Sequence, residues 1–200
     1  MKKHVLMAGL FIQVTLGTTP SVMAASPVQD SKENTPRCKG LIDKDGKITI
    51  SLKNKKTVEF INEPGEGDSG GTTYTCDQYL KNVGYYVFSM THGEDMDGFV
   101  LNERDGTIFN VNGTAFVSPN ETRIIFVSGE GADSPPSAEI WRVLPDKIER
   151  EWKQDFTGGG LSEVKWKTEK ELDFIDNSES KCVLRYKKSV WSLEKTAIND

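Results

Sequence analysis

Short runs of alternating apolar and polar residues, separated by turn signals, fill most of this 200-residue chain. Lys47–Leu52 and Val58–Ile61 alternate on either side of a turn at Asn54-Lys55, and an Asp-Gly turn at 105–106 separates two further runs. A period of two is typical of half-buried strands, and no stretch keeps the 3.6-residue period of an amphipathic helix. The chain is therefore expected to be all-β, and only residues 76–81 could form a short helix.

The second half of the chain contains two sets of four predicted strands, which form blade-like units at about 113–153 and 161–194. Val117 aligns with Trp166 and Trp152 with Trp191, which indicates a weak internal repeat of roughly 45 residues. The residues before these sets could supply a third, less regular unit. Three units are too few for a closed propeller, so we expect antiparallel meanders that form an incomplete propeller or a twisted β-sandwich.

The N-terminus has the pattern of a secretory signal peptide. Lys2 and Lys3 precede an apolar run from Val5 to Leu16, and small residues favour cleavage after Ala24. We expect a signal peptide at residues 1–24, a flexible leader at 25–37 and a single β domain at 38–200. The predicted location is periplasmic or secreted, without membrane insertion.

The composition restricts the partners and the disulfides. The formal charge is -5 at pH 7, which argues against nucleic acid as the partner, and we expect a monomer. Three cysteines lie in the mature chain, and in an oxidising compartment one pair is expected to be bridged. We favour Cys38–Cys76, since both lie in the less regular N-terminal part. Cys182 lies in an alternating strand and is expected to be a small buried side chain, with a reactive thiol as the alternative.

Catalytic and metal-binding patterns are sparse. His92 is the only histidine of the predicted mature chain, there is no G-x-S-x-G motif, and the cysteines lack zinc-ligand spacing. We therefore predict no enzyme, no catalytic residue, no cofactor and no metal. Glu94, Asp95 and Asp97 could bind calcium through their oxygens, but their spacing does not match the twelve-residue calcium loop. A solvated turn between strands is the preferred interpretation.

Two further groups of residues are interpreted as structural. Glu169, Glu171 and Asp173 are expected on the wet face of an edge strand rather than as a catalytic carboxylate pair. Each tryptophan lies in a strand pattern, which favours cross-strand packing. Trp152 and Trp166 flank a glycine-rich loop, and an exposed pair there would be a binding face.

Residues 116–127, F-V-S-P-N-E-T-R-I-I-F-V, resemble the F-S-P-D-G-K-R-I-A-F unit of TolB-like propeller blades. Ala138–Val143 resembles the strand that follows in that family. This sequence has Asn120-Glu121 where the family has Asp-Gly, so the turn is degenerate. The resemblance covers about 30 residues and implies a fold, because a hairpin between buried strands carries no chemistry.

A second resemblance concerns the order of features. A signal peptide, an N-terminal cysteine, a blade hairpin, a Gly/Ser-rich loop and an A-E-I strand follow one another, as in periplasmic immunity proteins that neutralise type VI secreted peptidoglycan amidases. In that group such a loop plugs the amidase cleft. The corresponding loop here is Ser128–Ser137.

This loop is the predicted recognition element, because it is longer than the other blade turns and long loops in compact domains are often functional. The expected partner-binding residues are Ser128, Gly129, Glu130, Asp133, Ser134 and Ser137. The expected function is that of a secreted, non-catalytic protein-binding module that acts on a secreted or periplasmic protein. An immunity or inhibitor protein against a peptidoglycan hydrolase is the sharper form, and a small-ligand-binding or envelope-assembly module is the alternative.

Overall fold

The computed structural model describes residues 38, 41–44, 46–65, 70–93, 95–129, 135–157, 160–176, 178 and 180–197. All of them lie in one compact unit, Thr35–Asp200. The predicted signal peptide and leader lie outside the described residues. The described part of the chain forms fifteen strands and no helix, which confirms the predicted all-β class.

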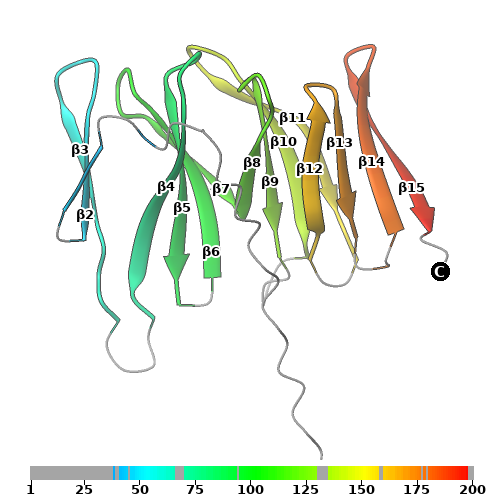
Figure 1. The fold of residues 1–200 in the computed structure, drawn as a ribbon, viewed down its shortest axis with the longest axis horizontal. Coiled ribbons are helices and arrows are strands. Elements are labelled where there is room, and N and C mark those ends of the chain that lie inside the picture. The colour runs from blue at the N-terminus through cyan, green and yellow to red at the C-terminus, as the bar shows by residue number, and fades with distance from the viewer. Residues whose placement is uncertain are drawn as a thin grey trace, which may run out of the picture. The chain divides into compact units, whose positions relative to one another are not determined.

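The strands form four antiparallel sheets, and in each sheet neighbouring strands follow one another along the chain as an up-and-down meander (Figure 1). The first sheet contains β1 (Ile42–Lys44), β2 (Lys47–Ser51) and β3 (Thr57–Ile61). The second contains β4 (Thr72–Leu80), β5 (Tyr85–His92), β6 (Asp95–Asn102) and β7 (Ile108–Asn112). The third contains β8 (Thr114–Val117), β9 (Arg123–Ser128), β10 (Ser137–Val143) and β11 (Ile148–Asp155). The fourth contains β12 (Ser162–Thr168), β13 (Glu171–Ile175), β14 (Ser180–Lys187) and β15 (Val190–Ala197).

The third and fourth sheets cover the ranges of the two predicted blade-like units. The residues before them, which we expected to supply a third unit, form two sheets instead. Residues 76–81, interpreted as a possible helix, lie mostly in strand β4 instead. A β-bulge between Cys76 and Gln78 explains the error. The bulge shifts the side-chain alternation by one residue, so Cys76 and Tyr79 join the same hydrophobic cluster at a spacing of three.

Three hydrophobic clusters join the sheets in succession. One connects the first sheet to the second, one connects the second to the third, and one connects the third to the fourth. The two middle sheets are therefore covered on both faces, and for that reason the first half of β5 and nearly all of β9 are buried without alternation. Each cluster has buried members from both of the sheets that it connects. Examples in chain order are Ile50 and Phe88, Val87 and Phe126, and Ile140 and Leu184.

The two end sheets carry polar residues on the face turned away from these clusters. In the first sheet, Lys47 pairs with Glu59 at 2.7 Å. In the fourth sheet, Lys181 pairs with Asp173 at 3.6 Å, and the Arg185 guanidinium binds neighbouring carboxylates. A closed propeller would bury both faces between blades. The polar faces instead end the series of sheets on both sides, as the terminal repeats of an open array do.

A buried ion pair of the third sheet, between Arg123 on β9 and Glu151 on β11, is contacted by side chains of the fourth sheet. The Arg123 side chain, 10% exposed, donates from Nε and Nη2 to the carboxylate of Glu151 at 2.7 and 3.2 Å. Trp191 donates its indole N–H to the same carboxylate at 3.0 Å, and the guanidinium lies 4.6 Å from the ring centroid of Tyr186. Burial alone would raise the pKa of Glu151, but the hydrogen bonds from Arg123 and Trp191 outweigh it and hold the pKa below its ordinary value.

The predicted edge-strand carboxylates occupy different places. Glu171 and Asp173 lie on β13, which is an inner strand between β12 and β14, so the edge-strand prediction was wrong. Glu169 lies in the preceding turn, where it accepts hydrogen bonds from Thr122 Oγ1 at 2.6 Å and from the backbone N–H of Asn120. Glu169 thereby fixes the turn before β9 to the fourth sheet.

The tryptophans have packing roles. Trp191 is buried in the cluster between the third and fourth sheets, and Trp152 and Trp166 pack against the same cluster. The indole N–H of Trp166 donates to the carbonyl of Phe116 at 2.9 Å. Trp152 and Trp166 are therefore half-buried supports of the sheet interface rather than an exposed pair.

Candidate functional site

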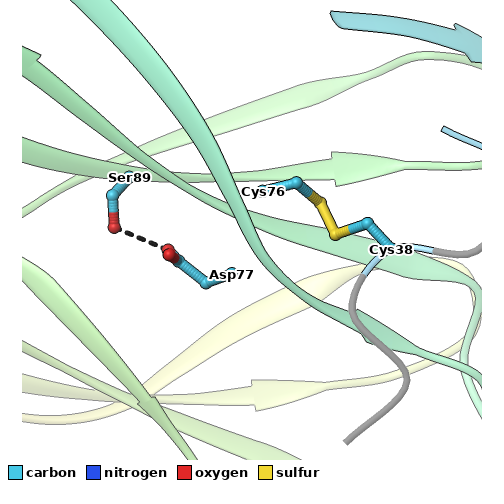
Figure 2. Close-up of a disulfide and its surroundings, with 4 residues drawn as sticks. All are labelled: Cys38, Cys76, Asp77 and Ser89. Carbon is cyan, nitrogen blue, oxygen red and sulfur yellow. Dashed lines mark hydrogen bonds between the residues drawn. A yellow bond between two sulfur atoms is a disulfide. The ribbon is translucent and has the colours of Figure 1, made fainter. Parts of the chain in front are cut away.

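The predicted disulfide between Cys38 and Cys76 is present, with the two Cα atoms 6.2 Å apart (Figure 2). It fastens the segment before the first sheet to strand β4 of the second. At the bulge that follows Cys76, the carboxylate of Asp77 accepts a hydrogen bond from Ser89 Oγ at 2.5 Å (Figure 2). The third cysteine, Cys182, is a buried free thiol, and burial raises its pKa to about 11. A thiol with such a pKa is mostly protonated at neutral pH, which fits a structural role.

The base of the predicted recognition loop is well defined. Ser128 and Ser137 are register partners at the ends of β9 and β10. Their hydroxyl oxygens lie 2.9 Å apart, and Ser128 Oγ also accepts from the backbone N–H of Ser137 at 3.1 Å. The carbonyl of Pro136 accepts from the N–H of Phe156 at 2.8 Å, which fixes the base to the end of β11.

The remaining predicted loop residues are only partly placed. Gly129 is exposed and faces open space. Glu130, Asp133 and Ser134 lie outside the described residues. Of the six predicted partner-binding residues, the structure thus brings Ser128 and Ser137 together, and it uses their hydroxyls to close the hairpin.

A groove of about 420 Å³ lies elsewhere, where strand β3 of the first sheet meets the second sheet. The pairing register explains its lining. Tyr74, Met90, Asp97 and Asn112 are successive partners across β4 to β7, and direct partners in antiparallel strands point to the same face. Phe99 and Asn110 are partners in the next row. Phe60, on strand β3 of the first sheet, packs against this same face. The residues that line the groove include Phe60, Tyr74, Phe99, Asp97, Asn110 and Asn112.

The apolar part of the groove is a fixed group of aromatic rings. The ring centroid of Phe60 lies 5.1 Å from that of Phe99 and 5.3 Å from that of Tyr74. Beneath them, Phe99 stacks on the buried ring of Phe88, with the centroids 4.8 Å apart. Because the lower rings belong to the core, the groove is formed before any ligand arrives.

The polar part of the groove consists of Asp97 on β6 and of Asn110 and Asn112 on β7. Strand β7 is the last strand of its sheet, and the two asparagines are exposed. Within the described residues, these three side chains have no hydrogen-bond or ion-pair partner. They therefore offer one carboxylate and two carboxamides to a ligand beside an aromatic surface.

His92 lies beyond the groove on the same face, at the end of β5. Its Nδ1 is 3.0 Å from Thr72 Oγ1, and both residues lie at an open end of the sheet. A hydroxyl next to an imidazole resembles an activated nucleophile, but activation also needs a group that orients the imidazole. Asp95 is the register partner of His92, yet the described residues contain no hydrogen bond between these two side chains. The contact is thus a pair rather than a triad.

The acidic cluster next to His92 differs from the sequence interpretation. Asp95 and Asp97 are part of strand β6 rather than of a solvated turn, and Glu94 lies outside the described residues. Strand pairing places Asp97 in the groove. No set of three or more His, Cys, Asp or Glu side chains in the described part of the chain is placed to hold a metal ion.

Sequence reasoning singled out Asp97 for another role and missed the other groove residues. The alternation Asn110-Val111-Asn112 was the available signal, because two amides on one face of a strand mark a polar edge. The position of Phe60 depends on how the first sheet packs, which the local pattern does not reveal.

Among known proteins, no family model matches this chain, and no curated protein is significantly similar to it. The described residues also include no helix with the length and apolar character required to cross a bilayer.

Proposed function

We propose that this chain is a secreted periplasmic protein-binding module without catalytic activity, and that it holds its partner in the groove formed by β3 and the second sheet. The observation that carries the proposal is the groove itself. Preformed aromatic rings lie beside three polar side chains that lack partners within the described residues. Aromatic anchors beside hydrogen-bonding groups are the composition that protein interfaces favour.

A protein partner fits the groove better than a small ligand does. Small-molecule sites enclose most of the ligand surface, whereas this groove opens along the exposed residues of β7. On its outer side β7 pairs with no described strand, and an unpaired edge can accept an extended segment of another chain. The alternative is a small-ligand-binding or envelope-assembly module, and the groove volume favours it, since about 420 Å³ is within the range of ligand pockets.

The periplasmic location rests on two features. The sequence predicts a signal peptide, and the disulfide belongs to an oxidising compartment. The resemblance to amidase immunity proteins suggests the class of target. In the sharper form of the proposal the partner is a peptidoglycan hydrolase, which the protein inhibits by occluding its cleft.

Site-specific photocrosslinking in periplasm tests the proposal. A photoreactive phenylalanine analogue replaces Asn110 in the groove, Gly129 at the loop base, or Lys188 in the exposed β14–β15 turn as the control. We expect one discrete protein adduct from position 110 and none from position 188. The same adduct from position 129 alone would move the site to the predicted loop, and equal labelling from all three positions would reject a specific partner. A captured hydrolase must then lose activity when the purified protein is added.

A further inference from the structure

The groove has the composition of a site for an organic cation. We propose that it binds a lysine or arginine side chain that the partner presents from an extended segment. This inference rests on the proposed function and specifies which part of the partner is recognised.

The charge of the groove determines the sign of the charge that its ligand carries. Asp97 is the one carboxylate among the described residues that line it, and that lining contains no Lys, Arg or His to neutralise it. Asp95 lies two residues before Asp97 on strand β6 and therefore on the same face of the sheet. An unpaired carboxylate in a concave site attracts a cation and repels an acidic segment.

The aromatic rings select an organic cation over a hydrated metal ion. A guanidinium or ammonium gains cation–π stabilisation within about 6 Å of an aromatic ring. Phe60 and Tyr74 line the groove together with Asp97, so one bound cation can meet ring surface and carboxylate at the same time. The aliphatic stem of lysine or arginine would lie along Met90 and Ile108, which are also lining residues.

Asn110 and Asn112 on β7 suit a partner segment that binds in an extended conformation. Their carboxamides each provide donors and an acceptor, which match the N–H and C=O groups of a peptide backbone. They lie two residues apart on the edge strand β7, and an added strand would place every second side chain on the groove face. A single basic side chain would then enter between two backbone contacts.

An NMR titration of the full protein with three blocked tripeptides tests the ligand class. The probes are acetyl-Ser-Arg-Ser-amide, its norleucine counterpart and its glutamate counterpart, and N,N′-diacetylchitobiose serves as the sugar probe. We expect saturable shifts of the side-chain amides of Asn110 and Asn112 with the arginine peptide only, and weaker binding at high salt. No saturable shift up to about 50 mM, or equal shifts with the norleucine peptide, would overturn the inference. Shifts with the disaccharide alone would assign the groove to a sugar.

Variants separate this inference from the proposed function. Asp97→Asn should weaken arginine-peptide binding by at least about fivefold, whereas Asp146→Asn, the same change at an exposed turn on the third sheet, should leave it unaltered. Phe60→Leu tests the ring contribution without altering the charge, and circular dichroism with melting verifies that each variant is folded. If a partner crosslinks at position 110 but binds the Asp97→Asn protein with unchanged affinity, the cation inference fails while the protein-binding function stands. If no partner crosslinks at position 110 and the arginine peptide still binds, the protein-binding function fails, while the groove remains a site for an organic cation.

Discussion

Replacement of Glu151 by alanine should destabilise the protein strongly, because it leaves the Arg123 guanidinium buried without its main partner. The two side chains are 10% and 13% exposed, and the carboxylate receives two hydrogen bonds from Arg123 and one from Trp191. Breaking a buried pair by removing one member costs about 3–5 kcal/mol, since the remaining charge stays desolvated.

The structure places the expected loss at the lower end of that range. Arg123 keeps a second carboxylate, that of Glu169, at 3.9 Å, and it donates to the backbone carbonyl of the same residue at 3.3 Å. We therefore expect a loss of about 3 kcal/mol in unfolding free energy. For a domain of this length that corresponds to a fall in Tm of roughly 6–12 °C.

Glu149 provides the matched control, because it lies two residues away on the same strand and also forms an ion pair. Its partner is Lys147, and both side chains are about half exposed. Glu149→Ala should cost no more than about 1 kcal/mol. Urea denaturation of both variants, with the slope of each transition compared, gives the two losses. Equal losses would refute the claim that burial of the Arg123–Glu151 pair makes it important.

Three further predictions concern the cysteines and one buried acid. Replacement of both Cys38 and Cys76 by serine should lower the unfolding free energy by about 3–4 kcal/mol, because the bridge closes a loop of 38 residues. A loss under about 1 kcal/mol in urea denaturation would contradict this prediction. Burial alone would raise the pKa of Asp176, but the hydrogen bonds from Lys195 and the β13–β14 turn hold it well below the ordinary value. The stability that Asp176 contributes is therefore complete above the carboxyl pKa of the unfolded chain and is lost as the pH falls. The unfolding free energy of Asp176→Asn, measured between about pH 2 and 6, should depend less on pH than that of the parent protein. Cys182, buried and with its pKa raised to about 11, should react with a thiol reagent at pH 8 only after unfolding, and rapid labelling of the native protein would show that its site opens.

Local pattern was sufficient for most strands and for the disulfide. The strand at 47–51 alternates because one of its faces is buried, and hydrophobic alternation records that fact directly. The Cys38–Cys76 bridge followed from the predicted compartment and from the position of the two residues. The bulge after Cys76 defeated the same reasoning, because one extra residue mimics helical spacing.

Pairing between strands accounts for what the sequence did not reveal. Asp97 reads as part of an acidic turn, and only its register with Asn112 and Met90 places it in a groove. Phe60 and Tyr74 are fourteen residues apart in sequence, and their ring contact depends on the packing of the first sheet against the second. Sequence alone singled out the loop from Ser128 to Ser137 by its length, whereas the alternation Asn110-Val111-Asn112 signals the polar edge of the groove and not its aromatic part.

The disulfide also determines how the molecule would carry a pulling force. All three strands of the first sheet lie within the covalent loop that Cys38 and Cys76 close. Tension applied at the N-terminal end would pass through the sulfur atoms into β4, so β1–β3 would bear none of it while the bond is intact. Reduction of the disulfide would let the first sheet, which has three described strands where the others have four, bear the force. In single-molecule extension, reduction should add an early event that releases about 38 residues.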